Sequence, residues 1–220
     1  MKAEQDPKSR LIEAAVRLFA EKGFDAVGIR EIAHLADVNS AAVSYHFGGK
    51  EGLYLAAVQA VMACSPTGIQ ELGMLPALDA PGARTAAIQG IRSHVRAFLE
   101  EILTCGQNEF GDWGQLLISR EMQAPRPALE PFMREQMTPY VSHMEACIRI
   151  LRPDLDQEAR MRAGIGIHGQ CLIYATHRGI IRLLLDVDPY APENLGALAS
   201  FVADFSLRGL GVPGHEIQGV

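Results

Sequence analysis

The chain has 220 residues, 48% of them hydrophobic, and a formal net charge of −6. This length allows one large domain or two small ones with a real hydrophobic core, and the acidic balance argues against a broad basic surface built around a polyanion. No apolar run approaches the roughly 20 residues of a membrane span, and the polar first ten residues lack the apolar stretch of a signal peptide. We therefore expect a cytoplasmic protein without a membrane segment.

The negative charge is unevenly distributed along the chain. Residues 1–50 contain seven Lys or Arg and seven Asp or Glu, so this segment is neutral and the remainder carries the whole net charge. A nucleic-acid contact is therefore expected within the first 50 residues, where it would depend on a few well-placed cations.

Apolar residues recur at helical spacing from the N-terminus onwards. The first helix is predicted to begin near Pro7, a residue suited to a first helical position, and to end at Gly23. Further helices are predicted over about residues 29–36, 40–46 and 50–63. Residues 65–82 contain three prolines and three glycines, which predicts an irregular connection to the rest of the chain.

The remaining part of the chain also reads as helices. They are predicted over about residues 84–103, 112–122, 127–151, 156–186 and 192–209. Pro131 and Pro139 are expected to shorten or kink the third of these, and Asp156 suits the N-cap of the fourth. Since no convincing strand or hairpin pattern occurs, the sequence predicts an all-α protein.

The helices over 29–36 and 40–46 have the spacing of a DNA-reading helix-turn-helix. Ala33 is small where the two helices would cross, and Asp37 follows four positions later at the turn, where a residue with positive φ is needed. Asn39 suits the N-cap of the next helix. Apolar residues at Ile32, Ala36, Val38 and Val43 would lock the two helices together. An ordinary corner in a helical bundle is the alternative, and the spacing favours the DNA-reading motif.

Several spaced elements of the N-terminal quarter agree, in order, with one known family. They are the run Ala14–Phe24, "IREIA" in the second helix, Val38 at the turn, "VSYHF" across the third helix and "KEGL" at the start of the fourth. With these elements the segment resembles the DNA-binding domain of the TetR family of bacterial transcriptional regulators. It departs from the usual pattern at Gly28, where a threonine often caps the second helix, at Asp37 instead of glycine, and at Ser44 instead of an aromatic residue.

The resemblance implies a homodimer with a helix-turn-helix domain over residues 1–50 and a helical regulatory and dimerisation domain over residues 51–220. It implies a repressor that binds a partly palindromic operator in double-stranded DNA and is released by an unidentified small-molecule ligand in the C-terminal domain. No cofactor is implied. The residues expected to face DNA are, by position, Arg30, Ser40, Ala41, Ala42, Ser44, Tyr45, His46 and Lys50.

Four of these side chains suit the sugar-phosphate backbone. Arg30 and Lys50 can neutralise phosphates, and Tyr45 and His46 can donate hydrogen bonds to phosphate oxygens. Packing in the core is the alternative for Tyr45, and local packing is the alternative for His46. The other four residues are small enough to approach the bases: the two alanines can touch thymine methyl groups, and the two serines can bond base edges.

The C-terminal part gives weaker signals. The small residues Ala163, Gly164 and Gly166 would permit close approach of a helix, either in a dimer interface of two helices per subunit or within one subunit. Candidates to line a ligand cavity, for which ordinary packing is the alternative, are Trp113, Arg120, Met137, Tyr140, Met144, His168, Cys171 and Tyr174.

Metal, redox and catalytic chemistry have little support in the sequence. His143 and Cys147, and His168 and Cys171, are pairs at helical spacing, but neither has a third convergent ligand, so no metal site is predicted. The four cysteines form no CxxC motif and are expected to be plain thiols. The chain shows no nucleophile motif, no paired Glu-x-x-His and no phosphate loop. We therefore predict no enzyme; the alternatives are a helical-bundle enzyme or an adaptor that does not bind DNA.

Overall fold

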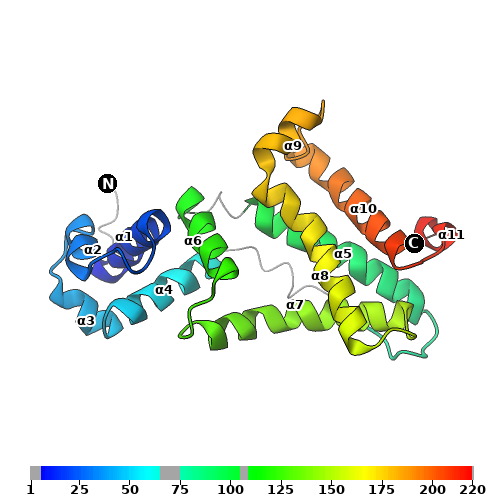
Figure 1. Ribbon diagram of the computed structural model, residues 1–220, viewed down its shortest axis with the longest axis horizontal. Coiled ribbons are helices and arrows are strands. Elements are labelled where there is room, and N and C mark those ends of the chain that lie inside the picture. Colours follow the sequence, from blue (N-terminus) through cyan, green and yellow to red (C-terminus); the bar gives the residue numbers. More distant parts are fainter. Residues whose placement is uncertain (1–5, 65–74, 105–108, 220) are drawn as a thin grey trace. The chain divides into compact units, whose positions relative to one another are not determined.

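The computed structural model describes residues 6–64, 75–104 and 109–219, in which every assigned element is an α-helix (Figure 1). The prediction of an all-α fold is confirmed. The helices are α1 (Pro7–Lys22), α2 (Ile29–Leu35), α3 (Ala41–Phe47), α4 (Lys50–Ala63), α5 (Ala83–Thr104), α6 (Gly111–Gln123), α7 (Glu130–Leu151), α8 (Gln157–Thr176), α9 (Arg178–Leu184), α10 (Pro192–Gly209) and α11 (Gly214–Gln218). Within these described segments, no helix is both long and apolar enough to cross a bilayer.

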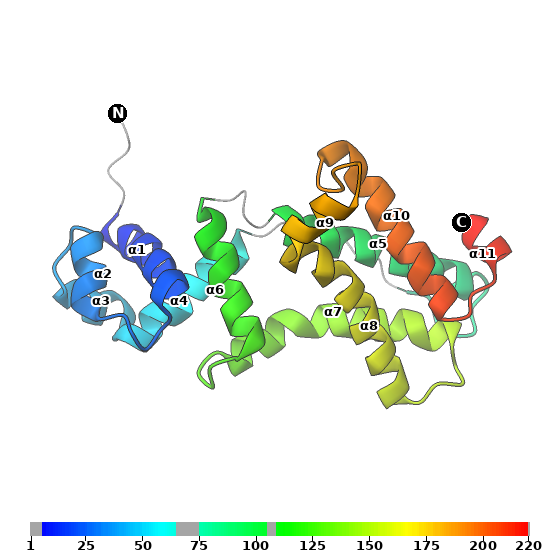
Figure 2. The ribbon, with the colours of Figure 1, turned by 45° about the horizontal axis from the view of Figure 1, so that its top comes forward.

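The helices form two compact units. The first comprises Met1–Pro66 and Thr104–Met133, and the second comprises Thr67–Leu103 and Arg134–Val220. In the first unit α6 returns from the middle of the chain to pack against α1 and α4 (Figure 2). The division predicted between residues 50 and 51 falls at the start of α4, inside the first unit, because α4 buries Leu53 and Ala57 in that unit's core.

The first unit is organised around α1. Asp6 accepts a hydrogen bond from the Lys8 amide at 3.3 Å, Pro7 occupies the first turn, and Gly23 ends the helix at φ 79°, which confirms both predicted ends. Phe19 of α1 is completely buried, as are Val43 of α3 and Leu117 of α6. This core holds α3, the helix expected to read DNA, through its buried side, which carries Val43.

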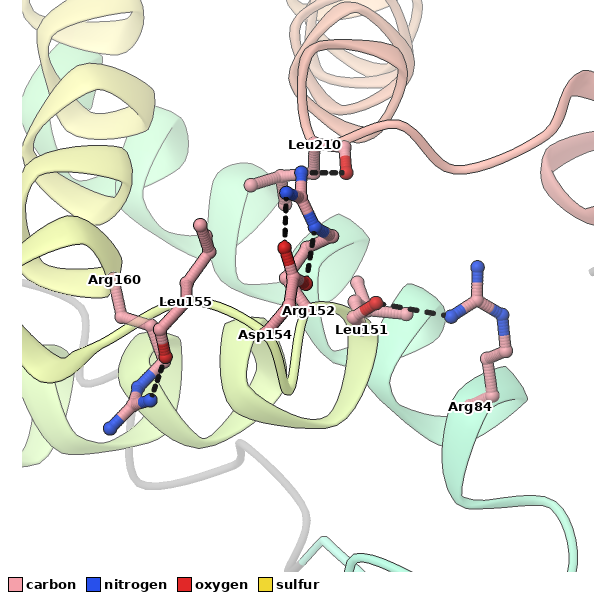
Figure 3. Close-up of polar contacts among 7 residues, drawn as sticks. All are labelled: Arg84, Leu151, Arg152, Asp154, Leu155, Arg160 and Leu210. Carbon is pink, nitrogen blue, oxygen red and sulfur yellow. Dashed lines mark hydrogen bonds and ion pairs between the residues drawn. The ribbon is translucent and has the colours of Figure 1, made fainter.

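The second unit has its own core between α5, α7, α8 and α10. Its fully buried side chains include Ile88, Leu99, Ile148 and Leu207. The Arg152 side chain holds the loop between α7 and α8, because it pairs with Asp154 at 2.7 Å and donates to the Leu210 carbonyl at 3.1 Å (Figure 3).

Two further contacts fix the two ends of the same loop. Arg84 of α5 donates to the Leu151 carbonyl at 3.2 Å, and Arg160 of α8 donates to the Leu155 carbonyl (Figure 3). Asp156 accepts from the Ala159 amide at 2.7 Å, which confirms its predicted role as the N-cap of α8. The loop is therefore tied to α5, α8 and the end of α10.

The predicted single helix over residues 156–186 is wrong. The structure breaks it at His177, whose φ of −121° and ψ of 30° are not helical, and gives α8 and α9 instead. The Thr176 hydroxyl bonds back to the Leu172 carbonyl at 2.9 Å, and Arg178 donates to the Leu103 carbonyl at 2.7 Å. A contact with a residue 75 positions earlier in the chain thus favours the break, and helical spacing alone does not reveal it.

Other boundaries differ in smaller ways. α7 begins at Glu130, which places Pro131 in its first turn, where proline is tolerated, and the helix continues through Pro139 to Leu151. The short helix α11 after Pro213 was not predicted. Of the predicted connection over 65–82, residues 65–74 lie outside the described residues, and residues 75–82 form no helix.

Candidate nucleic-acid interface

The turn between α2 and α3 has the predicted geometry. Asp37 has φ 52°, and the Val38 amide beyond it donates to the Ala33 carbonyl at 3.0 Å. Arg10 of α1 supports the turn, since its Nη1 donates to the Asp37 carbonyl at 3.2 Å. Asp37 takes this conformation without being glycine because a short polar side chain tolerates the left-handed region.

The start and the end of α3 are both fixed by local contacts. The Asn39 side chain accepts from the Ala41 amide at 2.8 Å, a hydrogen bond of the predicted capping kind, while Ser40 occupies the N-cap position itself. Gly48 ends the helix at φ 71°. A Cβ at Gly52 would lie 1.9 Å from the Phe47 carbonyl oxygen, so only glycine lets the end of α3 approach α4 so closely.

The predicted DNA-facing residues lie on the outside of this support. Tyr45 is 85% exposed, which excludes the alternative that it packs in the core. Its ring meets that of His46 edge-on at 4.9 Å, and His46 is also exposed. The remaining predicted residues are exposed, or half-buried in two cases (Ala42 and Lys50): Arg30, Ser40, Ala41, Ala42, Ser44 and Lys50.

A second cation contacts the same aromatic ring as Lys50. The Lys50 ammonium is 4.4 Å from the centre of the Phe24 ring, and the Arg126 guanidinium is 3.8 Å from the same centre. Arg126 also pairs with Asp25 at 3.1 Å. Sequence reasoning missed Arg126, which stands 76 positions after Lys50 in the segment "APRPA"; its only local signal is a cation between two prolines.

Arg126 is held in place by a buried carboxylate. Glu121 is 2% exposed and accepts from the Tyr54 hydroxyl at 2.6 Å and from the Arg126 amide at 3.1 Å. Burial and this hydrogen bond raise the pKa of Tyr54 above its ordinary value, so the phenol keeps its proton. These bonds tie the loop after α6 to α4, the helix that begins with Lys50.

The candidate ligand residues divide between the two units. Trp113 and Arg120 lie on α6 in the first unit, whereas Met137, Tyr140 and Met144 lie on α7 and His168, Cys171 and Tyr174 lie on α8 in the second. Met144 and Cys171 are buried in the second core. Tyr140 bonds the carboxylate of Glu101, and Tyr174 accepts at its carbonyl from the Tyr190 hydroxyl at 2.8 Å.

His168 belongs to a chain of three histidines in the second unit. His94, which is 1% exposed, contacts His168 Nε2 through its Nε2 at 2.8 Å and His143 Nδ1 through its Nδ1 at 3.4 Å. Burial, followed by the two neighbouring histidines, lowers the pKa of His94 to about 3. The outer rings use opposite nitrogens of His94, so the three rings do not converge on a point where a metal ion could sit.

Cys147 and Cys171 are buried thiols, whereas Cys64 is partly exposed. Burial raises the pKa of Cys147 and of Cys171 to about 12, which disfavours the reactive thiolate. Cys147 Sγ lies 3.9 Å from His143 Nδ1. Cys105 lies outside the described residues. Within the described ranges, no group of three His, Cys, Asp or Glu side chains is arranged to bind a metal ion.

Comparison with known proteins places both parts of the chain. The family model of the bacterial regulatory proteins of the tetR family matches residues 11–57, and that of the C-terminal domain of the HTH-type transcriptional dual regulator CecR matches residues 87–210. CecR of Shigella flexneri is 30% identical over 155 residues, 67% of this chain and 65% of CecR. The probable HTH-type transcriptional regulator YttP of Bacillus subtilis (strain 168) is 56% identical over 46 residues, 21% of this chain and 22% of YttP.

The likeness extends to solved structures. The crystal structure of AibR in complex with isovaleryl coenzyme A and operator DNA superposes with a TM-score of 0.58 at 15% identity, covering 91% of this chain and 97% of AibR. The chain spans less than two thirds of the length of CecR and of YttP. The matched families are transcriptional regulators, which confirms the prediction that this chain is not an enzyme. Because one family model covers its DNA-binding domain and the other more than half of its length, the chain belongs to the TetR family of bacterial transcriptional regulators.

Proposed function

We propose that the chain is a homodimeric repressor that binds a partly palindromic operator in double-stranded DNA and is released by a small molecule bound in the second unit. It would act in the cytoplasm, where bacterial DNA is found. The observation that carries the proposal is the exposed, small-residue face of α3, held rigidly by the Asp37 turn and by the close approach at Gly52. AibR, which shares this fold, was solved with operator DNA.

The exposed face of α3 suits close approach to the floor of a major groove. Ser40 and Ala41 are exposed at its start, where short side chains let the backbone come near the bases and bond or touch their edges. Tyr45, His46 and Lys50 follow at its end and would contact phosphates. Sequence selectivity would then come from methyl contacts, DNA shape and the spacing of the two half-sites.

Lys50→Ala and Ala42→Val should weaken DNA binding in different ways. Loss of the Lys50 ammonium removes one phosphate contact, so binding should fall for all sequences and the dependence of log Kd on log salt should flatten by about one unit. Ala42→Val enlarges a side chain that faces the bases and should change sequence preference. Fluorescence anisotropy with DNA from upstream of the chain's own gene, measured at several salt concentrations, checks both.

Arg96→Ala is the matched control, because it removes an exposed cation from α5 in the second unit, away from the exposed apolar surface of α8 and α10. We expect it to leave DNA affinity and its salt dependence unchanged. If Lys50→Ala and Ala42→Val both lowered the affinity equally for every DNA sequence, the assigned roles would be contradicted. Absence of salt-sensitive, sequence-selective binding by the unmodified protein would leave the adaptor alternative.

Large apolar side chains on α8 and α10 support a dimer. Ile165 is 63% exposed, Phe201 is 62% exposed and Phe205 is 58% exposed. The rings of Phe201 and Phe205 stack on each other at 6.3 Å on the outside of α10. A Cβ at Gly164 would lie 3.3 Å from Met144 of the same subunit, so Gly164 belongs to the packed face of α8. Nothing lies within 4 Å of a Cβ at Gly166, so Gly166 leaves room for another copy to approach the open face of α8. A second copy would remove this apolar surface from water.

The double substitution Phe201→Glu with Phe205→Glu should dissociate the dimer. Two carboxylates on each copy would oppose burial and repel those of the other copy, so the monomer should predominate at micromolar concentration. Operator affinity should fall with it, because one short reading helix gives weak selectivity. Light scattering coupled to size exclusion measures the mass, and Val141→Glu, at an exposed apolar position of α7, is the control. A variant that stays dimeric would place the interface elsewhere.

A further inference from the structure

A cavity of about 350 Å³ lies inside the first unit, separate from the second unit in which the proposed ligand would bind. It opens between α1, the end of α2 and the start of α6. Its apolar walls include Leu35 of α2 and Phe110 and Trp113 at the start of α6, and its polar wall includes Arg10 and Arg17 of α1. The volume is in the range of small-molecule sites, and one flat aromatic ring with a short polar substituent would fit it.

Arg10 links this cavity to the helix-turn-helix. Arg10 lines the cavity, and its Nη1 donates to the Asp37 carbonyl at 3.2 Å and lies 3.8 Å from the Asp37 carboxylate. Its Nε is buried and has no hydrogen-bond partner among the described residues. The guanidinium therefore supports the turn, and a carboxylate in the cavity, the acceptor best matched to a guanidinium, would compete with Asp37 for it.

Aromatic side chains also line the cavity. Trp113 is 38% exposed, and the Arg17 guanidinium lies 5.9 Å from the centre of its ring. Arg10 and Arg17 are seven residues apart on α1, so two turns of helix place both cations on one face. A planar ring packed on Trp113 could direct its substituent towards this cationic face.

The rim of the cavity limits the charge of its occupant. Glu13 and Glu109 also line it, and both are exposed. Their carboxylates would repel a second negative charge on a ligand, whereas a single carboxylate directed at Arg10 can pair with the guanidinium. The charge pattern favours a monoanion over a dianion and over a neutral molecule.

We propose that this cavity binds a planar aromatic monocarboxylate, whose carboxylate pairs with Arg10 and whose ring packs on Trp113. Binding competes with Asp37 for the Arg10 guanidinium, loosens the turn between α2 and α3, and so weakens DNA binding from within the first unit. Ligand binding itself is independent of the proposed function, and only its effect on DNA rests on it.

Trp113 gives a direct measurement, because it is the sole tryptophan of the chain. The probe is 4-methylbenzoate, titrated into the full chain while Trp113 fluorescence is excited at the red edge of its absorption band. We expect a saturable change, with at least tenfold weaker binding of neutral 4-methylbenzyl alcohol and of the dianion terephthalate. No saturable change, or an equal response to the three compounds, would overturn the proposal.

A pair of exposed positions gives the matched variants. Leu35 lines the cavity and is 44% exposed, whereas Leu116 on α6 is 39% exposed and is not among the lining residues. Leu35→Glu places a negative charge in the wall and should weaken 4-methylbenzoate binding at least tenfold, and Leu116→Glu should leave it unchanged. Both variants should keep the circular dichroism spectrum of the unmodified chain, since both positions are exposed. Equal binding by the two variants would contradict the site.

The effect on DNA is measured separately. Saturating 4-methylbenzoate should raise the Kd for DNA from upstream of the chain's own gene at least tenfold in the unmodified chain and should have no effect in Leu35→Glu. If the fluorescence titration succeeds and DNA affinity is unchanged, the proposed link through Arg10 and Asp37 is wrong. If the chain binds no DNA even without the probe, the proposed function fails while the binding result stands.

Discussion

Gly52→Ala is expected to lower the free energy of unfolding of the first unit by about 3 kcal/mol, in the upper range for overpacking substitutions. The added Cβ would lie 1.9 Å from the Phe47 carbonyl oxygen and 3.0 Å from its carbonyl carbon. Both are backbone atoms, so no side-chain rotation relieves the collision, and the end of α3 must move away from α4. Urea unfolding followed by Trp113 fluorescence measures the loss, since Trp113 lies in the first unit.

Gly28→Ala is the control for this prediction. A Cβ at Gly28 meets no atom within 4 Å, and its φ of −96° suits alanine. Gly28 is the N-cap of α2 and makes no side-chain bond there, so we expect a loss of about 0.5–1 kcal/mol, the difference between glycine and alanine at an N-cap and well below the loss for Gly52→Ala. Equal unfolding midpoints for the two variants would show that α3 tolerates displacement from α4. In DNA binding, Gly52→Ala should also weaken affinity, because the position of α3 depends on this contact.

The second unit is expected to lose stability as the pH falls below about 6.5, the ordinary pKa of histidine. In the folded chain the pKa of His94 is lowered to about 3, and burial also lowers the pKa of His143 and of His168. Between the folded and the unfolded pKa values the unfolded chain binds more protons, so the free energy of unfolding rises with pH across this window. His94 alone should cost about 3 kcal/mol at pH 4.5, taking about 1.4 kcal/mol per pKa unit.

Other titratable groups around the histidine chain also affect how the free energy of unfolding changes with pH, so the contribution of His94 is measured by comparing a variant with the unmodified chain. Burial raises the pKa of the Glu101 carboxyl, so this group acts in the opposite direction, and its neighbour Tyr140 stays protonated because burial and Glu101 raise its pKa. The Cys147 thiol beside His143 is also protonated throughout this range. His94→Leu should therefore remove a slope of about 1.4 kcal/mol per pH unit, compared with the unmodified chain over the same window.

Urea unfolding followed by circular dichroism, at several pH values between about 4.5 and 7, measures the slope. The control is His215→Gln, because His215 is exposed near the C-terminus of the same unit. It should leave the pH dependence unchanged. A slope for His94→Leu equal to that of the unmodified chain would show that His94 takes up a proton in the folded state and that the histidine chain rearranges to hold the charge.

The sequence by itself determined the local features of the first unit. It predicted the two ends of α1 at Pro7 and Gly23 and the left-handed turn at Asp37, and each is present. The capping hydrogen bond of Asn39 is present too, although the N-cap lies one residue later, at Ser40. These features depend on φ preferences and on hydrogen bonds between residues a few positions apart, which are readable from neighbouring residues. The exposed character of Tyr45 followed from its place in the motif, once the family pattern showed which face of α3 points outward.

Tertiary structure decided every feature that joins distant parts of the chain. It brought Arg126 to the Phe24 ring that Lys50 also contacts, placed α6 in the first unit, and set His94, His143 and His168 in one chain across α5, α7 and α8. These contacts join residues tens of positions apart, and no local spacing encodes which helix faces meet. The break at His177 has the same origin, because the Arg178 contact with the Leu103 carbonyl competes with continuation of a helix that its own sequence favours. Local hydrogen bonding was therefore readable from the sequence. The partners of Arg10, Lys50 and His94 come from distant parts of the chain, so only the tertiary structure shows them.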